Sequence, residues 1–225
     1  VLNVLRSAQA EKRQLGHVLL IAGSAGMPGA AAMATRAALE AGAGLVTTLT
    51  SRDVIGALAS SLPEAMWQSV PLNASGGITG DLVRMLAEFA PRAGSLLVGP
   101  GLPADPTTRS TVASIVRQVP LPLVLDASAL YPEMLSAIRQ RNQSAGPVIL
   151  TPHLGEWQRL TRGIRFTKGL EAALRAVSQQ YHLSILLKGA PSIIAHKDRL
   201  YYAPVGGPVL ARGGSGDILA GMLAT

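Results

Sequence analysis

The chain is predicted to be an α/β protein in which helices cover both faces of a mostly parallel central sheet. Short β-rich runs alternate with longer Ala-rich helical stretches, the pattern expected when crossover helices connect parallel strands. The 225 residues are 48% hydrophobic, enough for one sizeable core, and only 4% aromatic, so Ala, Leu, Val and Ile must build that core. No repeat, low-complexity tract or linker divides residues 1–225, and we expect a single domain.

The expected strands are short apolar runs. In chain order they are His17–Ala22, Leu45–Leu49, Ser95–Val98, Leu123–Asp126, Val148–Leu150, Ser184–Leu187 and Ser192–Ala195, with a weaker one at Leu200–Tyr202. The expected helices are longer stretches, at Ala30–Ala41, Gly80–Ala90, Thr107–Gln118 and Lys168–Tyr181. A last helix is expected from Asp217. The chain begins at Val1 and stops at Thr225, about two turns into that helix, so we expect a fragment of a longer polypeptide that lacks C-terminal helices.

Composition and charge argue against several classes of protein. The absence of Cys rules out disulfides, thiolate metal sites and cysteine nucleophiles. No apolar run reaches the ~18 residues of a membrane span and no signal-peptide pattern precedes the first strand, so a cytoplasmic protein without membrane contact is expected. The formal charge of +7 comes from basic residues spread singly between Arg6 and Arg212, and few aromatic side chains could stack on bases. The charge therefore favours steering of a polyanionic small molecule over binding of nucleic acid.

The most informative segment for function is Gly213-Gly-Ser-Gly-Asp217, which precedes an apolar run. Successive residues without side chains let backbone N–H groups crowd around an anion, and the following helix points its positive end at the same place. A carboxylate there would repel a phosphate unless it had a separate task, such as taking a proton from the hydroxyl that attacks the phosphate. The alternative is that the glycines form a loop and Asp217 caps the helix. The motif alone does not separate the two interpretations.

Four other unusual segments each follow an expected strand. They are Gly23–Gly29, Gly99–Gly101, Thr151–Glu156 and Lys188–Ser192. Taken singly, each has an ordinary explanation: the glycines as turns, His153 as a loop histidine, Glu156 as a first-turn helix carboxylate, and Lys188 as a solvated strand end. Open parallel sheets bind ligands at the carboxyl ends of their strands, so we expect these segments to converge on one crevice with the Gly213–Asp217 loop.

The same segments resemble a known family. In order, they read Gly23-Ser-Ala-Gly-Met-Pro-Gly-Ala30, Gly99-Pro-Gly-Leu102, Thr151-Pro-His-Leu-Gly-Glu156, Lys188-Gly-Ala190 and Gly213-Gly-Ser-Gly-Asp217. From about Glu11 to Met222 the chain is similar to the NAD(P)H-hydrate dehydratases of the ribokinase-like superfamily. The resemblance implies a three-layer α/β/α fold of the ribokinase-like type.

The resemblance also implies a reaction. ADP or ATP, with Mg²⁺, would phosphorylate the C6 hydroxyl of hydrated NADH or NADPH, and loss of phosphate would restore the dihydropyridine. It implies that Asp217 is the base, and that the anion hole consists of Gly214, Ser215 and Gly216. The implied contacts to the hydrated substrate are Ala30, Gly101, His153 and Asp217. The implied nucleotide contacts are Lys188, Gly189, Ala190, Pro191, Ser192 and Gly216. It further implies a homo-oligomer, a tetramer in the family, and fusion to or cooperation with an NAD(P)H-hydrate epimerase.

Two segments depart from the family pattern. Glu11-Lys-Arg-Gln14 stands where the family usually has His-Lys-Gly-Asp, and Asp126-Ala-Ser-Ala-Leu-Tyr131 stands where it usually has Asp-Ala-Asp-Ala-Leu-Asn. A carboxylate and an amide that could help to order metal, phosphate or substrate are therefore missing. Three functions stay open: the dehydratase, a small-molecule kinase of the same fold that acts on a vitamin-precursor alcohol, and a nucleotide-binding module that has lost catalysis. His153 and Glu156 favour the first function over the second, and Ser128 and the altered Glu11–Gln14 segment favour the third.

Overall fold

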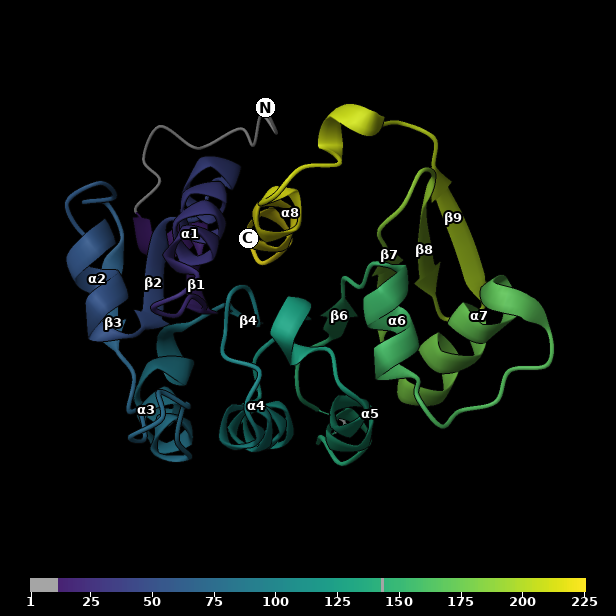
Figure 1. Cartoon of the computed structure of the whole chain (residues 1–225), viewed down its shortest axis with the longest axis horizontal. Coiled ribbons are helices and arrows are strands. Elements are labelled where there is room, and N and C mark those ends of the chain that lie inside the picture. Colours follow the sequence, from purple (N-terminus) through teal and green to yellow (C-terminus); the bar gives the residue numbers. More distant parts are fainter. Residues whose placement is uncertain (1–11, 143) are drawn as a thin grey trace.

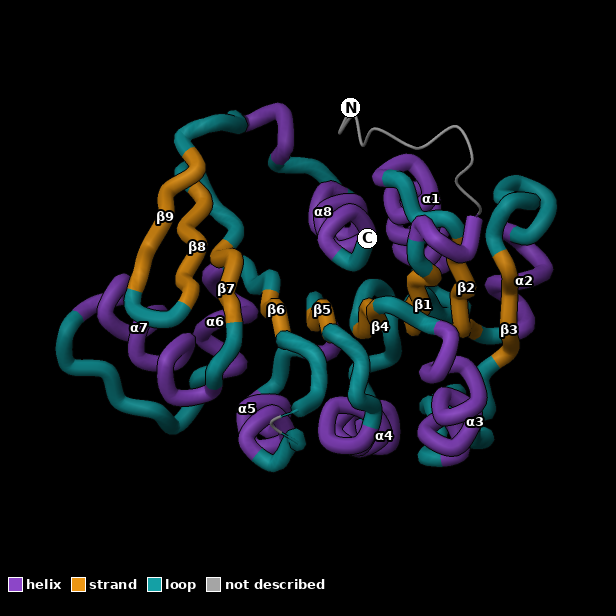
Figure 2. The backbone as a smooth tube through the Cα atoms, turned by 180° about the vertical axis from the view of Figure 1, so that it is seen from behind, coloured by secondary structure: helices purple, strands orange, loops and turns teal. Residues whose placement is uncertain are grey.

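The computed structural model describes residues 12–142 and 144–225, which form one nine-stranded sheet (Figures 1 and 2). The strand order is β3-β2-β1-β4-β5-β6-β7-β8-β9. Strands from β3 to β7 pair in parallel, while β8 and β9 are antiparallel and end the sheet as a hairpin. The bounds are β1 His17–Ile21, β2 Leu45–Thr50, β3 Met66–Ser69, β4 Ser95–Val98, β5 Leu123–Leu125, β6 Val148–Leu150, β7 Ser184–Leu187, β8 Ser192–His196 and β9 Arg199–Ala203.

Helices lie on both faces of this sheet (Figure 1). Helices α1 and α8 cover one face, with α2 beside α1 near the β3 edge, and α3 to α7 cover the other. The bounds are α1 Pro28–Ala41, α2 Arg52–Leu58, α3 Asp81–Phe89, α4 Pro106–Gln118, α5 Pro132–Arg139, α6 Leu154–Leu160, α7 Gly169–Tyr181 and α8 Ser215–Leu223. Short 3₁₀ turns are η1 Lys12–Leu15, η2 Ala90–Arg92, η3 Ala127–Ala129 and η4 Pro208–Leu210.

The central strands are apolar throughout because both of their faces are buried. In β1, Val18 and Leu20 belong to the core under α1 and α8, whereas Leu19 and Ile21 belong to the core under α3 to α7. The same alternation continues in β4 and β5, as the period of two requires. The core under α3 to α7 is the larger of the two and contains most of the Leu, Ile and Val side chains.

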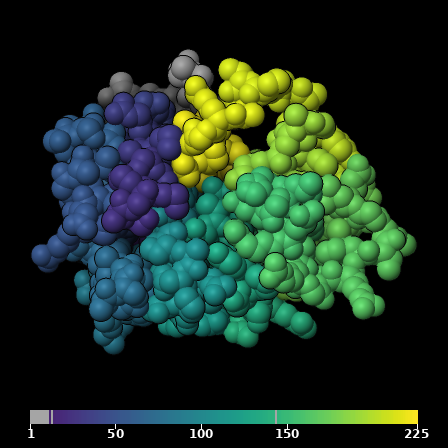
Figure 3. Space-filling model, viewed as in Figure 1, coloured from purple at the N-terminus to yellow at the C-terminus, as the bar shows by residue number. Residues whose placement is uncertain are grey.

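The opposite face depends on small residues. Helix α8 packs against α1 through Ala and Gly, and a Cβ atom on Gly221 would lie 2.3 Å from the carbonyl oxygen of Ala34. The space-filling view shows the yellow C-terminal segment seated against the purple N-terminal part (Figure 3). Close approach of the two helices fixes where the amino end of α8 lies relative to the sheet, and that end carries Asp217.

Every strand and helix that the sequence predicts is present, with ends that differ from the predicted ones by at most two residues. The α/β class and the mostly parallel sheet are confirmed. The last helix begins at Ser215 and not at Asp217. Four elements were not predicted: β3, α2, α5 and α6. All four are short, so each shows little of its period, and β3 is an edge strand with polar Gln68 and Ser69 in it. Within the described residues, no helix is long and apolar enough to cross a bilayer.

Candidate active site

The segments that follow the parallel strands meet along the carboxyl edge of the sheet, and each contacts the next. The amide of Gly23 donates to the carbonyl oxygen of Pro100 at 2.7 Å. A Cβ atom on Gly99 would lie 1.8 Å from the carbonyl oxygen of Asp126, so the loop after β4 lies directly against the end of β5. The amide of Lys188 donates to the carbonyl oxygen of Pro152 at 2.7 Å. The structure therefore brings the five predicted segments to one rim.

One part of this rim, here called the glycine half, consists of Gly23–Ala30 and Gly99–Gly101 and contains no ionisable side chain. Gly101 has a left-handed φ of +65°, and a Cβ atom there would lie 2.7 Å from that of Ala30 and 3.0 Å from the carbonyl oxygen of Met27. Ala30 and Gly101, both predicted to contact substrate, are thus in contact with each other. Ala30 itself is buried, with 8% of its surface exposed, whereas Met27 of the same half is 50% exposed.

The other part, the charged half, consists of Asp126, Glu156, Lys188 and Asp217. Lys188 Nζ lies 2.7 Å from Asp126 Oδ1 and 3.5 Å from Glu156 Oε2, so one ammonium group bridges two carboxylates. Thr151 Oγ1 also donates to Asp126 Oδ1, at 2.8 Å. Burial raises the pKa of Asp126 above the ordinary carboxyl range, although the attraction and hydrogen bond of Lys188 oppose that rise. The ion pair is therefore what makes a buried carboxylate tolerable here.

His153 and Glu156 cap α6 reciprocally. The His153 Nδ1 atom accepts from the Glu156 amide at 3.2 Å, and Glu156 Oε2 accepts from the His153 amide at 2.8 Å. Nδ1 is an acceptor, so the neutral imidazole carries its proton on Nε2, which lies 3.4 Å from Glu156 Oε1. Both residues therefore have a structural role at the start of α6, and Glu156 is the first-turn helix carboxylate that the sequence allows. The imidazole is still largely exposed, with 59% of its side chain accessible, and can also contact a ligand.

The amino end of α8 lies against the charged half. Gly214 is the N-cap, with a left-handed φ of +87°, and a Cβ atom there would lie 2.1 Å from Met33 Sδ. A Cβ atom on Gly216 would lie 3.2 Å from Lys188 Nζ. Both positions therefore suit glycine, and the ammonium of Lys188 sits beside the first turn of α8. Ser215 and Gly216 are the first two residues of the helix, where amides have no partner within the helix, although the Ser215 amide donates to the carbonyl oxygen of Arg212 at 3.4 Å.

Asp217 is the third residue of α8, so it is not the N-cap, and the capping alternative for this residue is wrong. Burial raises the pKa of Asp217 above the ordinary carboxyl range, and the negative charges of Asp126 and Glu156 add to that rise while Lys188 opposes it. A carboxylate with raised proton affinity next to amides that suit an anion is the combination expected of a general base in phosphoryl transfer.

The predicted nucleotide segment forms the connection between β7 and β8. Gly189, Ala190 and Pro191 are exposed in this turn, and Ser192 is the first residue of β8. The Ser192 hydroxyl donates to the carbonyl oxygen of Gly189 at 3.0 Å. The Lys188 side chain points away from this turn toward Asp126 and Glu156. The segment therefore reaches from an open surface to the centre of the charged half.

The two departures from the family pattern lie in different places. Glu11 is outside the described residues. The following turn, η1, packs on Gly44 just before β2, at the amino edge of the sheet and opposite the candidate site. Ser128 and Tyr131 instead follow β5 directly and lie on the site's own rim. Among the described residues of these two segments, those after β5 are therefore the ones placed to affect the chemistry of this chain's site.

The described residues 12–142 and 144–225 contain no group of three acidic or histidine side chains that could hold a metal ion. Lys188 occupies the space between Asp126 and Glu156. The donor set thus fits Mg²⁺ only as an ion carried by nucleotide phosphates, which is a common way for Mg²⁺ to bind.

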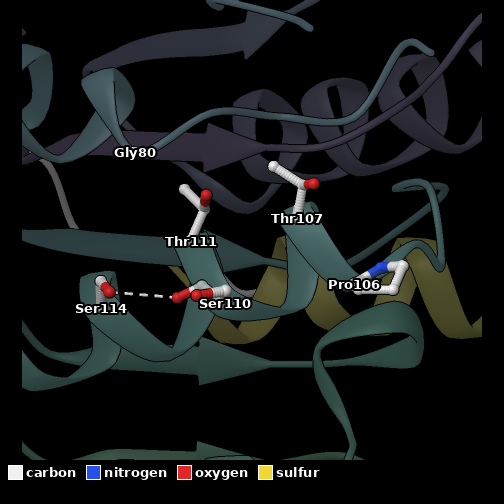
Figure 4. A pocket seen from close by; sticks show the side chains of 6 residues that line it. All are labelled: Gly80, Pro106, Thr107, Ser110, Thr111 and Ser114. Atoms are coloured by element: carbon white, nitrogen blue, oxygen red, sulfur yellow. Dashed lines mark hydrogen bonds between the residues drawn. The ribbon is translucent and has the colours of Figure 1, made fainter.

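A separate groove runs beside α4 (Figure 4). It is lined by Gly80, Pro106, Thr107, Ser110, Thr111 and Ser114, and the Ser114 hydroxyl donates to the Ser110 carbonyl oxygen at 3.0 Å. None of the predicted site residues lines it. It offers hydroxyl groups and no charge, so it is not a candidate for the chemistry described above.

Asp126 is the site residue that sequence reasoning did not include. The sequence signal for Asp126 was present, because it is a carboxylate directly after the apolar residues of a strand. The sequence analysis instead counted Asp126 as the last residue of the expected strand Leu123–Asp126. Thr151 was likewise seen only as part of a motif. Long-range pairing with Lys188, 62 residues further on, is visible only in the structure.

The family model described as NAD(P)H-hydrate dehydratase matches residues 18–225. The chain belongs to the NAD(P)H-hydrate dehydratase family. It is 37% identical over 222 residues to the bifunctional NAD(P)H-hydrate repair enzyme Nnr of Moorella thermoacetica, covering 97% of this chain and 42% of that protein. The chain thus spans about two fifths of the length of that bifunctional relative.

Solved structures agree with this assignment. The ADP/ATP-dependent NAD(P)H-hydrate dehydratase of Bacillus subtilis, co-crystallised with ATP and Mg²⁺, is 32% identical with a TM-score of 0.77, over 97% of this chain and 74% of that one. A ribokinase-like superfamily protein of Enterococcus faecalis has the same TM-score at 31% identity, over 97% of this chain and 73% of that one. The fold is therefore ribokinase-like.

Proposed function

We propose that this chain carries out the nucleotide-dependent dehydration of (6S)-NAD(P)H hydrate to NAD(P)H. The observation that carries the proposal is Asp217, a half-buried carboxylate whose pKa is raised and which lies in the first turn of a helix opened by glycines. Family membership and the relatives named as dehydratases support the same reaction. ADP or ATP is the proposed donor, since the Bacillus subtilis relative is named as using both.

In the proposed mechanism Asp217 accepts the proton of the C6 hydroxyl as the hydroxyl oxygen attacks the terminal phosphorus of the donor. The bond between that phosphorus and its bridging oxygen breaks, and the donor leaves as a nucleotide with one phosphate fewer. The amides at the amino end of α8, from Gly214 to Gly216, receive the transferred phosphoryl group, and the Lys188 ammonium beside Gly216 balances its charge. The C6–O bond then breaks, inorganic phosphate leaves, and loss of a proton from the neighbouring ring carbon restores the double bond. Hydroxide leaves poorly from carbon, and phosphorylation converts it into a good leaving group.

The glycine half is the proposed seat of the hydrated nicotinamide nucleotide. Ala30 and Gly101 contact each other there. The exposed imidazole of His153 lies on the next part of the same rim. Lys188–Ser192 and Gly216 are proposed to hold the nucleotide donor. Mg²⁺ bound to the donor's phosphates would neutralise part of their charge.

Cooperation with an NAD(P)H-hydrate epimerase is also part of the proposal. The repair enzymes of Moorella thermoacetica and Salinibacter ruber are named as bifunctional, which supports it. Assembly into a homo-oligomer and location in the cytoplasm stay predictions, as does the lack of nucleic-acid and membrane contacts.

The test is direct. Purified (6S)-hydrate is mixed with the protein, Mg²⁺ and either ADP or ATP, and the dihydronicotinamide absorbance is followed while phosphate release is measured. We expect equal amounts of NAD(P)H and phosphate, with both formed about 10²- to 10⁴-fold more slowly by Asp217→Asn. A phosphoester that accumulates without NAD(P)H would instead identify a kinase, and nucleotide binding without any product would identify a binding module.

A further inference from the structure

The turn that follows Asp126 has an unfavourable backbone conformation. Ala127 has a φ of +48°, in the left-handed region that residues with a Cβ atom seldom adopt. The turn continues as η3 and reaches Leu130 before α5 begins. The position of this turn matters for the site, because Asp126 immediately precedes it and a movement of the turn would move the Asp126 carboxylate.

Arg159 of α6 holds this turn in place. Its Nε atom donates to the carbonyl oxygen of Leu130 at 2.9 Å, and Nη2 donates to that of Ala127 at 2.8 Å. One planar guanidinium group therefore binds both ends of the turn, and a single ammonium could reproduce only part of this geometry. The Ala127 carbonyl oxygen also accepts from the Leu130 amide at 3.1 Å within η3, so Arg159 adds its two hydrogen bonds to a turn that is already closed by one of its own.

The ring of Tyr131 packs against the Arg159 guanidinium group and limits its movement. The Arg159 guanidinium carbon lies 4.4 Å from the centre of the Tyr131 ring, and that of Arg109 lies 4.8 Å from it. Cation–π contacts of this length restrict where the guanidinium groups can lie. Tyr131 is one of the two rim positions at which the chain departs from the family pattern, so this ring contact is a property of the present sequence.

Arg159 joins the two segments that carry the carboxylates of the charged half. Asp126 stands just before the turn that Arg159 binds, and Glu156 lies on α6 three residues before Arg159. Both carboxylates contact the Lys188 ammonium. On the opposite side, the close approach of Gly99 to the Asp126 carbonyl oxygen prevents the turn from moving toward β4.

We propose that Arg159 is a positioning residue, which sets the separation of Asp126 and Glu156 and thereby holds the Lys188 ammonium beside the amino end of α8. The catalytic consequence rests on the function proposed above. The ammonium faces the place where the phosphoryl group would be transferred, and a misplacement of about 1 Å can lower a rate by about 100-fold. Arg159 itself touches no reacting atom.

The experiment compares Arg159→Met, Arg159→Lys and, as a matched control, Arg162→Met. Arg162 is exposed just beyond the end of α6, and no hydrogen bond or ion pair joins its side chain to the charged half. For each variant we measure kcat, KM for the hydrate, ADP affinity by calorimetry, and Tm. We expect Arg159→Met to lower kcat by about 10- to 100-fold and weaken ADP binding by about 3- to 10-fold, with KM for the hydrate within about threefold. Arg159→Lys should recover part of both losses, and Arg162→Met should match the wild type.

Two results would overturn the inference. The first is a kcat and ADP affinity of Arg159→Met within about twofold of the wild type. The second is a loss of kcat that Arg159→Lys does not relieve and that parallels a large fall in Tm, because the residue would then serve stability alone. If the wild type does not convert the hydrate at all, the proposed function fails, whereas the calorimetric comparison still tests the position of Lys188.

Discussion

The glycine half and the charged half of the site occupy one rim but are built from different groups. The glycine half places backbone close to backbone, and Gly101 is fixed by a left-handed φ and by contact with Ala30. The charged half places carboxyl side chains from three segments near one ammonium group from a fourth. The first half can recognise a ligand by shape, and the second can move a proton and stabilise charge. Substitutions in the two halves should therefore fail in different ways.

The largest effect is expected from Asp217→Asn, in the charged half. Asn has almost the same shape but cannot accept the proton, so turnover should fall by about 10²- to 10⁴-fold. Because Gly214 and not Asp217 caps α8, the free energy of unfolding should change by about 1 kcal/mol or less. ADP affinity should persist or increase, since a negative charge near the phosphates is removed. Turnover, calorimetric ADP binding and chemical denaturation are measured together, and turnover within a few-fold of wild type would remove Asp217 from the mechanism.

The next effect concerns Lys188→Met, which removes the shared cation. Asp126 has only 2% of its side chain exposed, and breaking a buried pair from one side costs about 3–5 kcal/mol. The double variant with Asp126→Asn should regain much of that stability, because the more deeply buried of the two carboxylates is then uncharged, while Glu156 keeps its hydrogen bond from the His153 amide. A double variant no more stable than Lys188→Met would show that the pair does not control stability here.

The same variant tests the electrostatics of Asp217. Lys188 opposes the rise in the pKa of Asp217. Asp217 must be ionised to act as a base, so activity should rise as pH rises through its pKa. This acid limb of the pH–activity profile should move to higher pH in Lys188→Met.

Asp126 has a raised pKa in the folded state. Its contribution to stability is full in acid and is lost as pH rises through that raised value, so the variant should be relatively more stable in acid than at neutral pH.

Gly101→Ala tests the glycine half, where the expected fault is in binding. The left-handed φ of +65° and the 2.7 Å approach to the Ala30 Cβ atom both oppose a methyl group. We expect a loss of about 1–3 kcal/mol in unfolding free energy and a rise of about tenfold in KM for the hydrate, with kcat little changed. Gly26→Ala, in the same half, is the control, because no atom lies within 4 Å of its new Cβ position. Equal effects at the two glycines would contradict a role for close packing.

The two halves also differ in how far the sequence predicts them. The glycine half follows from local signals, since Gly23 to Gly29 and Gly99 to Gly101 come directly after apolar strands. The charged half depends on pairs such as Asp126 with Lys188, which are distant in sequence and meet only because β5, β6 and β7 are neighbours. Helix α6 was missed for a different, local reason. Its cap is a His with Glu three residues later, whereas the usual sequence signal is Ser, Thr, Asp or Asn.

The smallest effect is expected at His153, which stands between the two halves and has two separable roles. His153→Ala removes the Nδ1 acceptor of the Glu156 amide and should cost about 1 kcal/mol of stability, whereas His153→Ser restores an N-cap and should cost less. If the exposed imidazole also binds the dinucleotide, both variants should raise KM for the hydrate to a similar extent and lower kcat much less. Steady-state kinetics beside chemical denaturation separate the two roles, because Ser replaces the cap and not the imidazole ring.

An unchanged KM in His153→Ser would show that the residue serves only as a cap of α6. Equal losses of kcat and kcat/KM in that variant would instead place the imidazole in the transition state, as a second candidate beside Asp217 for moving the proton.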